Sequence, residues 1–364
     1  MKKTIFLCTI SLDQMAGGIE RQLIYLANHL SRYYFVNIIT LDLATATSFY
    51  PINREVKWHK VGNSTPHNSI SFYKRINQIL EIRKILKKSE KFNLVCFHHG
   101  LLFRFFIASL GFEKYLICSE RNSLQLYSKI SQSKFTVNFL LLYFVNKITV
   151  QFNDYIKQYP DCIRKKIVVI PNCIKPSLKI ANPELPNKNG RYKILTIGRL
   201  CRQKNHQIQI EAFHALSKKF PLWDLYIYGE GPLRPQLINL IKELQLTDRV
   251  FINSPVKNIS NIFFTSHIFC ITSLWEGFPN ALAEAMAHGL PCVGFSACDG
   301  VNNLIKNNKS GFLTNSSDLQ KAMQILMKSK FLRKTFGNKA LEHSKAYNPR
   351  KILKVWEGAL NYNF

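Results

Sequence analysis

Two carboxylates stand eight positions apart in the segment 273–287 (SLWEGFPNALAEAMA), at Glu276 and Glu284. Glu276 falls in a turn after a predicted strand at 268–272, and Glu284 falls in a predicted helix at 280–288. Because a carboxylate accepts hydrogen bonds from vicinal hydroxyls, two placed this way could hold two sugar rings, such as a hexose and a ribose. The same pair could act as a catalytic acid and base, or lie on an ordinary surface.

The turn between these carboxylates has the composition of a ligand-binding loop. Gly277 and Pro279 shape its backbone. The N–H groups of Phe278, Asn280 and Ala281 could then face an anion or a sugar.

Two adjacent glycines, Gly17 and Gly18, stand between a predicted strand at 4–9 and a predicted helix at 18–31. Without side chains they let backbone N–H groups approach a ligand, and the start of a helix adds partial positive charge suited to phosphate. The spacing matches neither GxGxxG nor GxxxxGK[ST], which disfavours a dinucleotide or P-loop site. An ordinary strand-to-helix turn explains the pair equally well.

Short apolar runs alternate with helical stretches along the whole chain. Strands are predicted at 4–9, 35–41, 94–97, 115–119, 147–150, 193–197, 224–228, 250–252 and 268–272. Helices are predicted at 18–31, 71–88, 101–110, 137–144, 206–218, 233–244, 280–288 and 318–328. Strands that are apolar on both faces and separated by helices indicate parallel sheets covered by helices on each side.

A polar segment rich in Pro and Asn at 175–191 separates two such series and indicates an interdomain linker. The fold class is therefore α/β, with two Rossmann-like doubly wound domains in tandem. We assign the chain as an N-terminal domain at 1–175, a linker at 176–192, a second domain at 193–345 and a C-terminal helix at 346–364.

Composition excludes several classes of protein. The chain has 364 residues, of which 46% are hydrophobic and 12% aromatic, so a disordered chain is excluded. Nine scattered cysteines without a CxxC pair indicate neither a zinc site nor a disulfide framework, and they favour a reducing cytoplasm. We expect the apolar start of the chain to form a strand rather than a signal peptide. The longest apolar run, 139–145, is far shorter than the ~20 residues of a membrane span.

The order of several further motifs carries a resemblance to a known family. These motifs are V-I-P-N at 169–172, I-G-R-L at 197–200, Q-K-N at 203–205, Y-G-E-G-P-L at 228–233 and the carboxylate segment at 273–287. With Gly17-Gly18, they resemble glycosyltransferase family 4, the group 1 retaining transferases of GT-B fold. The resemblance implies two domains that face a central cleft, with the C-terminal helix returning to the N-terminal domain.

The resemblance also implies a donor site on the second domain. Arg199 and Lys204, next to Gly198, would grip the pyrophosphate of a nucleotide-diphosphate sugar. Glu284 would hold the ribose, and Glu276 would meet the transferred sugar. The residues that would line the loop around sugar and phosphate are Gly277, Phe278, Pro279, Asn280, Ala281 and Leu282. Those that would lie near the nucleotide base are Gly229, Gly231 and Leu233.

On the first domain, the resemblance points to a histidine after the strand at 94–97 that contacts the donor sugar or acceptor. His98 fits best, with His99 close behind, although a histidine of the domain core is an alternative. In the S-E-R-N element at 119–122, Arg121 could steer an anionic acceptor or form a structural salt bridge.

Two further observations bear on the chemistry. Asn303 stands where the family usually has glutamate, and Val301 where it usually has proline. Without a D-x-D motif on a loop after a strand, we expect a metal-independent transferase that requires no cofactor besides its nucleotide-sugar co-substrate. The resemblance implies transfer of a hexose or N-acetylhexosamine, with a UDP-sugar among the expected donors. A GT-B epimerase is the nearest alternative.

The formal net charge of +28 is spread over both predicted domains and exceeds what a donor site needs. A predicted basic helix within 71–91 carries an apolar stripe at Ile76, Ile79, Leu80, Ile82, Ile85 and Leu86. That helix could lie on an anionic membrane, or its stripe could pack in the core. We expect a cytoplasmic enzyme, peripheral on the inner face of the cell membrane, with a lipid-linked or lipopolysaccharide glycan acceptor. Without a nucleic-acid-binding motif, nucleic acid is not an expected partner.

Overall fold

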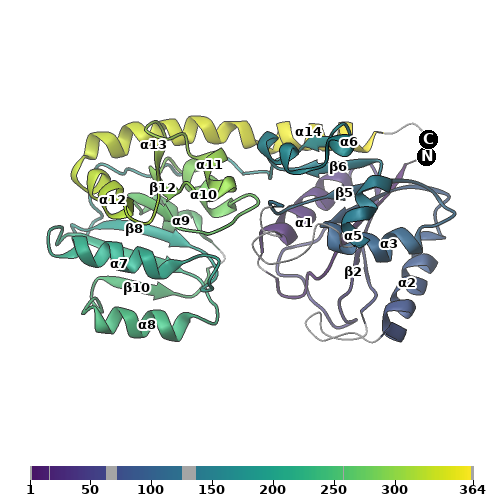
Figure 1. Ribbon diagram of the computed structural model, residues 1–364, viewed down its shortest axis with the longest axis horizontal. Helices are drawn as coiled ribbons and strands as arrows, with labels where there is room; N and C mark the ends of the chain where they lie inside the picture. Colours follow the sequence, from purple (N-terminus) through teal and green to yellow (C-terminus); the bar gives the residue numbers. More distant parts are fainter. Residues whose placement is uncertain (1, 16, 63–71, 125–136, 257, 362–364) are drawn as a thin grey trace. The chain divides into compact units, whose positions relative to one another are not determined.

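The computed structural model describes residues 2–15, 17–62, 72–124, 137–256 and 258–361. The chain divides into two compact units (Figure 1). Unit 1 comprises Met1–Cys173 together with Arg350–Phe364, and unit 2 comprises Ile174–Pro349. The boundaries assigned from the sequence, at 175 and 346, compare with structural junctions at 173/174 and 349/350.

Unit 1 is built on a seven-stranded parallel sheet with the order β3-β2-β1-β4-β5-β6-β7. Its strands are β1 (Thr4–Thr9), β2 (Phe35–Thr40), β3 (Lys57–Lys60), β4 (Lys91–Phe97), β5 (Glu113–Ser119), β6 (Lys147–Val150) and β7 (Ile167–Val169). The sequence did not predict the edge strands β3 and β7, because they are short and lack a fully buried apolar run.

Helical segments lie between these strands, except between β2 and β3, which an irregular connection joins. They are α1 (Gly18–Leu30), α2 (Phe72–Leu86), η1 (His99–Leu101), α3 (Leu102–Ala108), α5 (Val137–Leu140), η2 (Leu141–Phe144), η3 (Asn153–Gln158) and α6 (Asp161–Arg164). The predicted helix at 137–144 is thus one short α-helix followed by a 3-10 turn. Ser71, the predicted start of the basic helix, lies outside the described residues.

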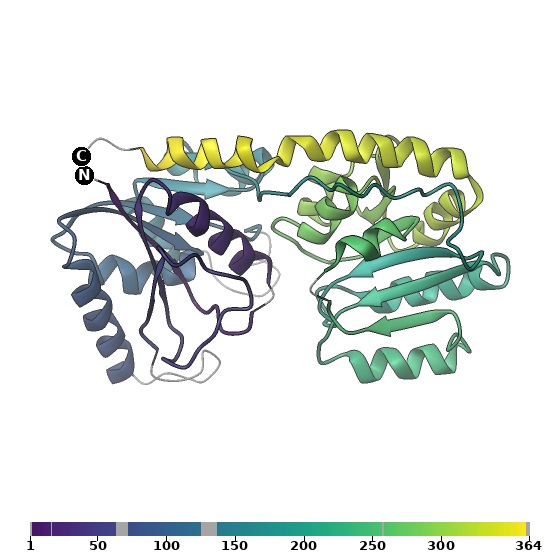
Figure 2. The same ribbon diagram turned by 180° about the vertical axis from the view of Figure 1, so that it is seen from behind.

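The last helix, α14 (Pro349–Leu360), completes the core of unit 1. Its apolar face, with Leu353 and Trp356, packs among residues of β1, β4 and α1. Figure 2 shows this helix, in yellow, lying along unit 1. His29 on α1 contacts Glu357 at 3.0 Å, and the Asn93 side chain donates to the Leu360 carbonyl at 3.1 Å. The predicted return of the C-terminal helix to the first domain is confirmed.

Unit 2 has a six-stranded parallel sheet with the order β10-β9-β8-β11-β12-β13. Its strands are β8 (Tyr192–Ile197), β9 (Trp223–Tyr228), β10 (Val250–Asn253), β11 (Ile268–Ile271), β12 (Cys292–Phe295) and β13 (Gly311–Thr314). Its helical segments are α7 (His206–Ser217), α8 (Arg234–Glu243), α9 (Ser260–Phe264), α10 (Asn280–Ala287), α11 (Asp299–Leu304), α12 (Leu319–Lys328), α13 (Lys330–Ser344) and η4 (Lys345–Tyr347). The predicted doubly wound α/β class is confirmed for both units.

The strand β12 was not predicted because Gly294 interrupts its apolar run. A Cβ atom at that position would meet the side chains of Val301 and Ile305, so the glycine allows α11 to pack directly on the strand. In the described part of the chain, no helix combines the length and the apolar character that crossing a bilayer demands.

Two buried histidines make the stability of unit 2 depend on pH. Burial lowers the pKa of both His206 and His267 to about 4. His267 is fixed as a neutral tautomer: its Nδ1 accepts from the Lys193 N–H at 2.9 Å, and its Nε2–H donates to the Leu185 carbonyl at 2.8 Å. In the unfolded chain both rings bind protons near pH 6.5.

We therefore expect unit 2 to be most stable above pH 6.5 and to lose stability as the pH falls toward about 4. In that window the unfolded chain binds more protons than the folded one, at roughly 1.4 kcal/mol per pH unit for each histidine. Urea denaturation at several pH values should show a shallower pH dependence in His267→Gln than in the parent. His214→Gln, at an exposed position of α7, is the control and should keep the parental slope. Equal slopes in all three proteins would contradict the assignment.

Candidate active site

A buried hydrogen-bond network in unit 2 fixes the loop between β8 and α7. The Thr196 hydroxyl donates to Gln209 Oε1 at 2.8 Å, and Gln209 Nε2 donates to the Thr272 hydroxyl at 2.8 Å. The Thr272 hydroxyl is in turn shared between the carbonyls of Lys204, at 3.1 Å, and Asn205, at 2.9 Å. The end of β11 therefore holds the loop that carries the predicted phosphate-binding cations.

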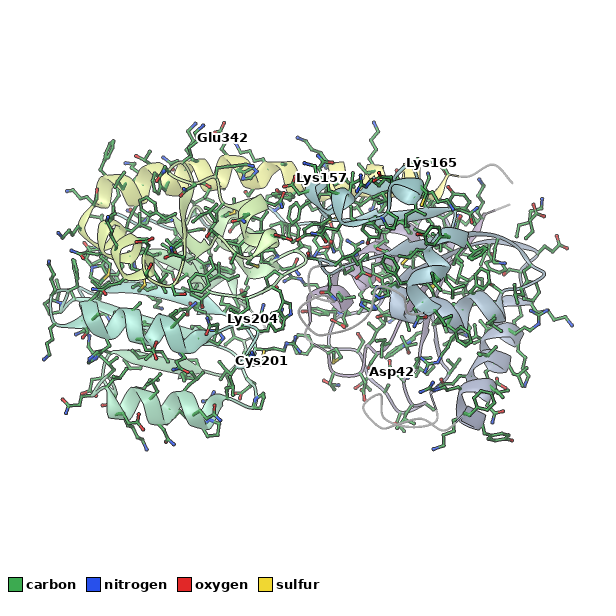
Figure 3. All side chains as sticks on the ribbon, viewed as in Figure 1. Asp42, Lys157, Lys165, Cys201, Lys204 and Glu342 are labelled. Atoms are coloured by element: carbon green, nitrogen blue, oxygen red, sulfur yellow. The ribbon has the colours of Figure 1, made fainter. Side chains whose placement is uncertain are left out.

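Lys204 forms an ion pair with Glu276 at this edge of the sheet. Both side chains are largely buried, at 18% and 9% exposure. Gly198 leaves room for the lysine, because a Cβ atom there would lie 3.2 Å from its methylene carbons. Figure 3 labels Lys204 on the loop that leads into α7. The sequence assigned Lys204 to phosphate and Glu276 to sugar without predicting that they contact each other.

The neighbouring loop segments are tied by backbone and amide bonds. The Leu274 N–H donates to the Gln203 carbonyl, and Gln203 Nε2 donates to the Trp275 carbonyl, each at 2.8 Å. These bonds hold the turn that carries Glu276 against the loop that carries Lys204. The two loops therefore form one preorganised surface.

The Arg199 side chain is exposed on this surface, whereas its backbone carbonyl is fixed by a buried histidine. His206 Nε2 lies 3.1 Å from the Arg199 carbonyl, and because burial lowers the pKa of His206 to about 4, the neutral ring donates this bond. The Arg199 guanidinium reaches Gln203 Oε1 at 3.3 Å. A permanent cation is thus presented to solvent beside the buried Lys204–Glu276 pair.

The turn after β9 rests on the same loop. The Leu200 N–H donates to the Glu230 carbonyl, and the Leu233 N–H donates to the Leu200 carbonyl, both at 2.9 Å. A Cβ atom at Gly229 would strike the Gly198 carbonyl, and one at Gly231 would strike the backbone of Leu200. The close approach of these backbone segments therefore requires glycine at both positions, whether or not a ligand binds. The sequence placed the two glycines only near a nucleotide base.

The loop that follows Glu276 buries the side chains of two predicted ligand positions. Phe278 is 5% exposed and packs edge-on against Tyr347 with ring centroids 5.3 Å apart. Leu282 is fully buried. Both side chains complete the interior of unit 2, so a contact of these positions with a ligand would have to come from the backbone, as the sequence predicted for the Phe278 N–H. Glu284, by contrast, is half-buried on α10.

The other residues of this loop differ in their exposure. Gly277 and Pro279 are buried, whereas Asn280 and Ala281 are partly exposed in the first turn of α10. Asn303, at the position of the family's usual glutamate, donates through Nδ2 to the Asp299 carbonyl at 3.0 Å, within its own helix. Of the predicted loop contacts, side-chain access is therefore retained by Asn280, Ala281 and Glu284.

In unit 1, His98 ends β4 in a strained conformation. Its φ of +111° is costly for any residue with a Cβ atom, and such strain clusters at functional sites. Its Nδ1 accepts from the Gly100 N–H at 2.9 Å, and its ring stacks on His99 with centroids 4.4 Å apart. The ring is 22% exposed. The structure therefore brings the two predicted histidines together at the carboxyl end of the strand.

A buried carboxylate that the sequence interpretation did not assign holds these histidines. Glu120 is 1% exposed and accepts from His99 Nδ1 at 2.5 Å and from the backbone N–H groups of Arg121, at 3.0 Å, and Asn122, at 3.1 Å. Burial raises its pKa, but the charges of His98 and His99 and these hydrogen bonds outweigh burial and lower it to about 2. Glu120 therefore stays ionised and fixes the orientation of His99.

The register of the sheet contains a signal for Glu120. Phe97 of β4 pairs with Ser119 of β5, so the residues that follow these strands must lie side by side. Among the described residues, His98, His99 and Glu120 are also the cluster whose ligand atoms could hold a metal ion, all within 4.8 Å of one another. Because both oxygens of Glu120 accept N–H bonds, we interpret the cluster as hydrogen-bonded rather than metal-binding.

Arg121 points into the core of unit 1. It is 5% exposed, donates to Asn172 Oδ1 at 3.0 Å, and lies over the rings of Phe97 and Trp356 at 5.2 and 5.3 Å. Burial lowers the pKa of its guanidinium to about 10. These contacts join the V-I-P-N segment to the sheet and to α14. Of the two predicted alternatives they fit the structural one, although through hydrogen bonds and aromatic faces rather than a salt bridge.

Gly17 caps α1, and the carboxylate of Glu20 folds back against it. Glu20 is 9% exposed, in the first turn of the helix, where a negative charge is favoured. Gly18 is partly buried beside it. A phosphate bound at this helix start would meet a like charge, a feature that the sequence pattern did not reveal.

Comparison with known proteins places these features in a family. The family described as Glycosyl transferases group 1 matches residues 179–343, nearly all of unit 2. The chain is 27% identical over 355 residues to the amylovoran biosynthesis glycosyltransferase AmsD of Erwinia amylovora, covering 95% of this chain and 96% of that protein. It is 26% identical over 371 residues to an α-1,4-N-acetyl-D-galactosaminyltransferase of Campylobacter jejuni whose name includes a PP-undecaprenol glycan, covering 98% and 97%. Unit 2 is thus that of a group 1 glycosyltransferase, and these relatives along the whole chain carry glycosyltransferase names.

Solved structures show the fold of this glycosyltransferase. The Anabaena protein HepE, crystallised with UDP and glucose, matches it with a TM-score of 0.79 at 17% identity, covering 100% of both chains. The predicted GT-B fold and group 1 family are confirmed.

Two alternative substitutions of His98 by a small residue separate the effect of backbone strain from the effect of losing the imidazole. Both His98→Gly and His98→Ala remove the ring, but glycine tolerates the φ of +111° better. We therefore expect the glycine variant to have a free energy of unfolding about 1 kcal/mol higher than the alanine variant in urea denaturation. Both should transfer sugar at least tenfold more slowly than the parent. Equal stability of the two variants would argue against strain, and near-normal transfer in both would argue against a role for the ring.

Proposed function

We propose that this glycosyltransferase is retaining and metal-independent. In this proposal it moves a hexose or N-acetylhexosamine from a nucleotide-diphosphate sugar, such as a UDP-sugar, to a lipid-linked or lipopolysaccharide glycan. The observation that carries the proposal is the preorganised loop surface of unit 2, where exposed Arg199 adjoins the buried Lys204–Glu276 pair. Two cations on the loop between β8 and α7 match a diphosphate that must be held and then released.

In this proposal, Lys204 and Glu276 each exchange their mutual contact for a contact with the donor. Before donor binding, Glu276 neutralises Lys204, so neither buried charge lacks compensation. A donor diphosphate would compete for Lys204, and Glu276 would then accept hydrogen bonds from hydroxyls of the transferred sugar. Glu284, half-buried on α10, would accept those of the ribose. His98, strained and partly exposed in unit 1, is our assignment for a contact with sugar or acceptor.

Retention follows if the leaving diphosphate acts as the base. The acceptor hydroxyl attacks the anomeric carbon on the face from which the diphosphate departs. The bond between the anomeric carbon and the phosphate oxygen breaks, and the hydroxyl proton passes to a phosphate oxygen. Glu276 is not assigned as the nucleophile of the alternative covalent route, because in this proposal hydroxyls of the transferred sugar engage its carboxylate once Lys204 turns to the diphosphate. Arg199 and Lys204 would stabilise the charge that builds on the diphosphate.

The acceptor and location are proposed from the relatives and the charge. AmsD is named for the biosynthesis of amylovoran, and the Campylobacter enzyme for a glycan on PP-undecaprenol. A cytoplasmic enzyme of cell-surface polysaccharide biosynthesis, peripheral on the inner face of the membrane, would meet such acceptors. A net charge of +28 favours an anionic lipid surface there.

Arg199→Ala and Glu284→Ala should each reduce sugar transfer at least tenfold without lowering the unfolding temperature, because each removes a contact to bound donor rather than a core contact. Initial rates with a screened panel of UDP- and GDP-sugars measure this. Arg202→Ala removes another exposed cation from the same loop and is the matched control, expected to stay near the parental rate. Near-normal turnover in either test variant would remove that residue from the proposed donor site.

Chelation and product stereochemistry test the proposed mechanism. We expect full activity in excess EDTA, because protein cations rather than a metal ion stabilise the leaving group in this proposal. The product's anomeric configuration, determined by NMR, should equal that of the donor. Inversion would rule out the proposed attack geometry, and activity lost in EDTA and restored by a divalent cation would rule out metal independence.

A further inference from the structure

Helix α2 has two distinct faces. Gln78, Ile82 and Leu86 are buried against unit 1 at four-residue spacing. Phe72, Ile76 and Leu80 repeat with the same spacing on another face, and they are 79%, 39% and 50% exposed. The apolar stripe predicted from the sequence is therefore divided, since one part packs in the domain and another faces solvent.

The helices that adjoin α2 also expose apolar side chains. Helix α2 contacts α3, and α3 contacts α5 (Figure 1). Arg83 on α2 donates to the Ala108 and Leu110 carbonyls at the end of α3, at 3.1 and 2.7 Å. The Phe103 N–H donates to Asn138 Oδ1 on α5 at 3.0 Å, and the rings of Phe106 and Phe144 lie 6.0 Å apart.

We call these segments, α2, α3, Leu110, α5 and η2, the α2–η2 face. Its exposed apolar side chains are Phe72, Tyr73, Ile76, Leu80, Phe103, Ile107, Leu110, Val137, Leu140, Tyr143 and Phe144. These are 11 of the 24 large hydrophobic side chains exposed among the described residues. Such a concentration is unusual for a surface that meets only water.

The charge of the same face is strongly positive. Its basic residues are Lys74, Arg75, Arg83, Lys84 and Arg104, followed by Lys87 and Lys88 just beyond α2. The acidic residue on these helices is Glu81, which pairs with Lys84 at 2.7 Å. Arg104 on α3 adds positive charge beside that of α2, and partial burial and the charge of Arg75 lower the pKa of Arg104.

We propose that the α2–η2 face docks this enzyme on an anionic lipid bilayer, with the exposed aromatic and aliphatic side chains entering the interface while the lysines contact lipid phosphates. This inference deepens the proposed function and rests on its membrane-linked acceptor. Aromatic rings are favoured at the headgroup level of a bilayer, and cations near it gain from the negative surface potential. Exposed apolar residues intermixed with cations are the combination that an interfacial surface requires.

Charge selects the bilayer over a second copy of this chain. An isologous dimer through this face would place two cationic surfaces against each other, with Glu81 as the acidic residue on the helices available for pairing. An anionic bilayer instead offers opposite charge together with an apolar layer. The exposed rings of Phe72 and Phe144 would serve no purpose in a purely electrostatic contact.

Vesicle flotation of the full-length protein tests the proposal. We expect binding to vesicles rich in phosphatidylglycerol and at least tenfold weaker binding to vesicles of phosphatidylcholine alone. The triple variant Phe72→Ser/Leu80→Ser/Phe144→Ser should bind the anionic vesicles at least tenfold more weakly. Lys84→Glu/Lys87→Glu/Lys88→Glu should also bind them at least tenfold more weakly at low salt. Phe331→Ser, at a 72% exposed position of α13 in unit 2, is the matched control and should bind normally.

Two further measurements separate this proposal from the others. Transfer to a short soluble acceptor should be unchanged in the triple serine variant, so loss of docking and failure of the proposed chemistry are read independently. Sedimentation should show the parent as a monomer without vesicles. Normal vesicle binding by the triple serine variant, or a dimer that this variant abolishes, would overturn the proposal.

Discussion

The parallel pairing of neighbouring strands is the constraint on which the candidate functional residues of each unit depend. Strand β8 pairs with β11, and β4 with β5, so the residues that follow each pair emerge at the same edge of their sheet. Lys204 and Glu276 meet across 72 positions, and His99 and Glu120 meet across 21. Register decides which side chains meet, and the buried network through Gln209 removes the freedom that remains in the β8 loop.

The two buried carboxylates are compensated in different ways, and this difference separates their roles. Glu120 is held by backbone N–H groups as well as by His99, and backbone donors cannot withdraw, so it suits the fixing of a neighbour. Glu276 is compensated by Lys204, whose ammonium ends a flexible stem and can move to a better partner. An exchangeable pair suits a site that alternates between empty and occupied, whereas a permanent one suits positioning.

Local patterns predicted much of this structure, and contacts between distant segments were the part they could not supply. Alternating apolar runs and helices predicted the α/β class, and the motif around Glu276 predicted the family. The burial of Phe278 and Arg121 was not predictable, because a motif specifies residue types but not the direction in which side chains point. Glu120 was overlooked although the strand ends indicated it, since its partners follow a different strand.

The basic residues that give the net charge of +28 lie in different surroundings and therefore have different roles. Arg121 and Arg333 are buried, with guanidinium groups that donate to backbone carbonyls, so their charge holds segments together and attracts no partner. Lys204 is paired within the site. The lysines of α2 remain at the surface beside exposed Phe72, and it is this association with apolar side chains that separates an interfacial surface from a nucleic-acid-binding one. Net charge alone therefore cannot identify a partner, whereas the neighbours of each cation can.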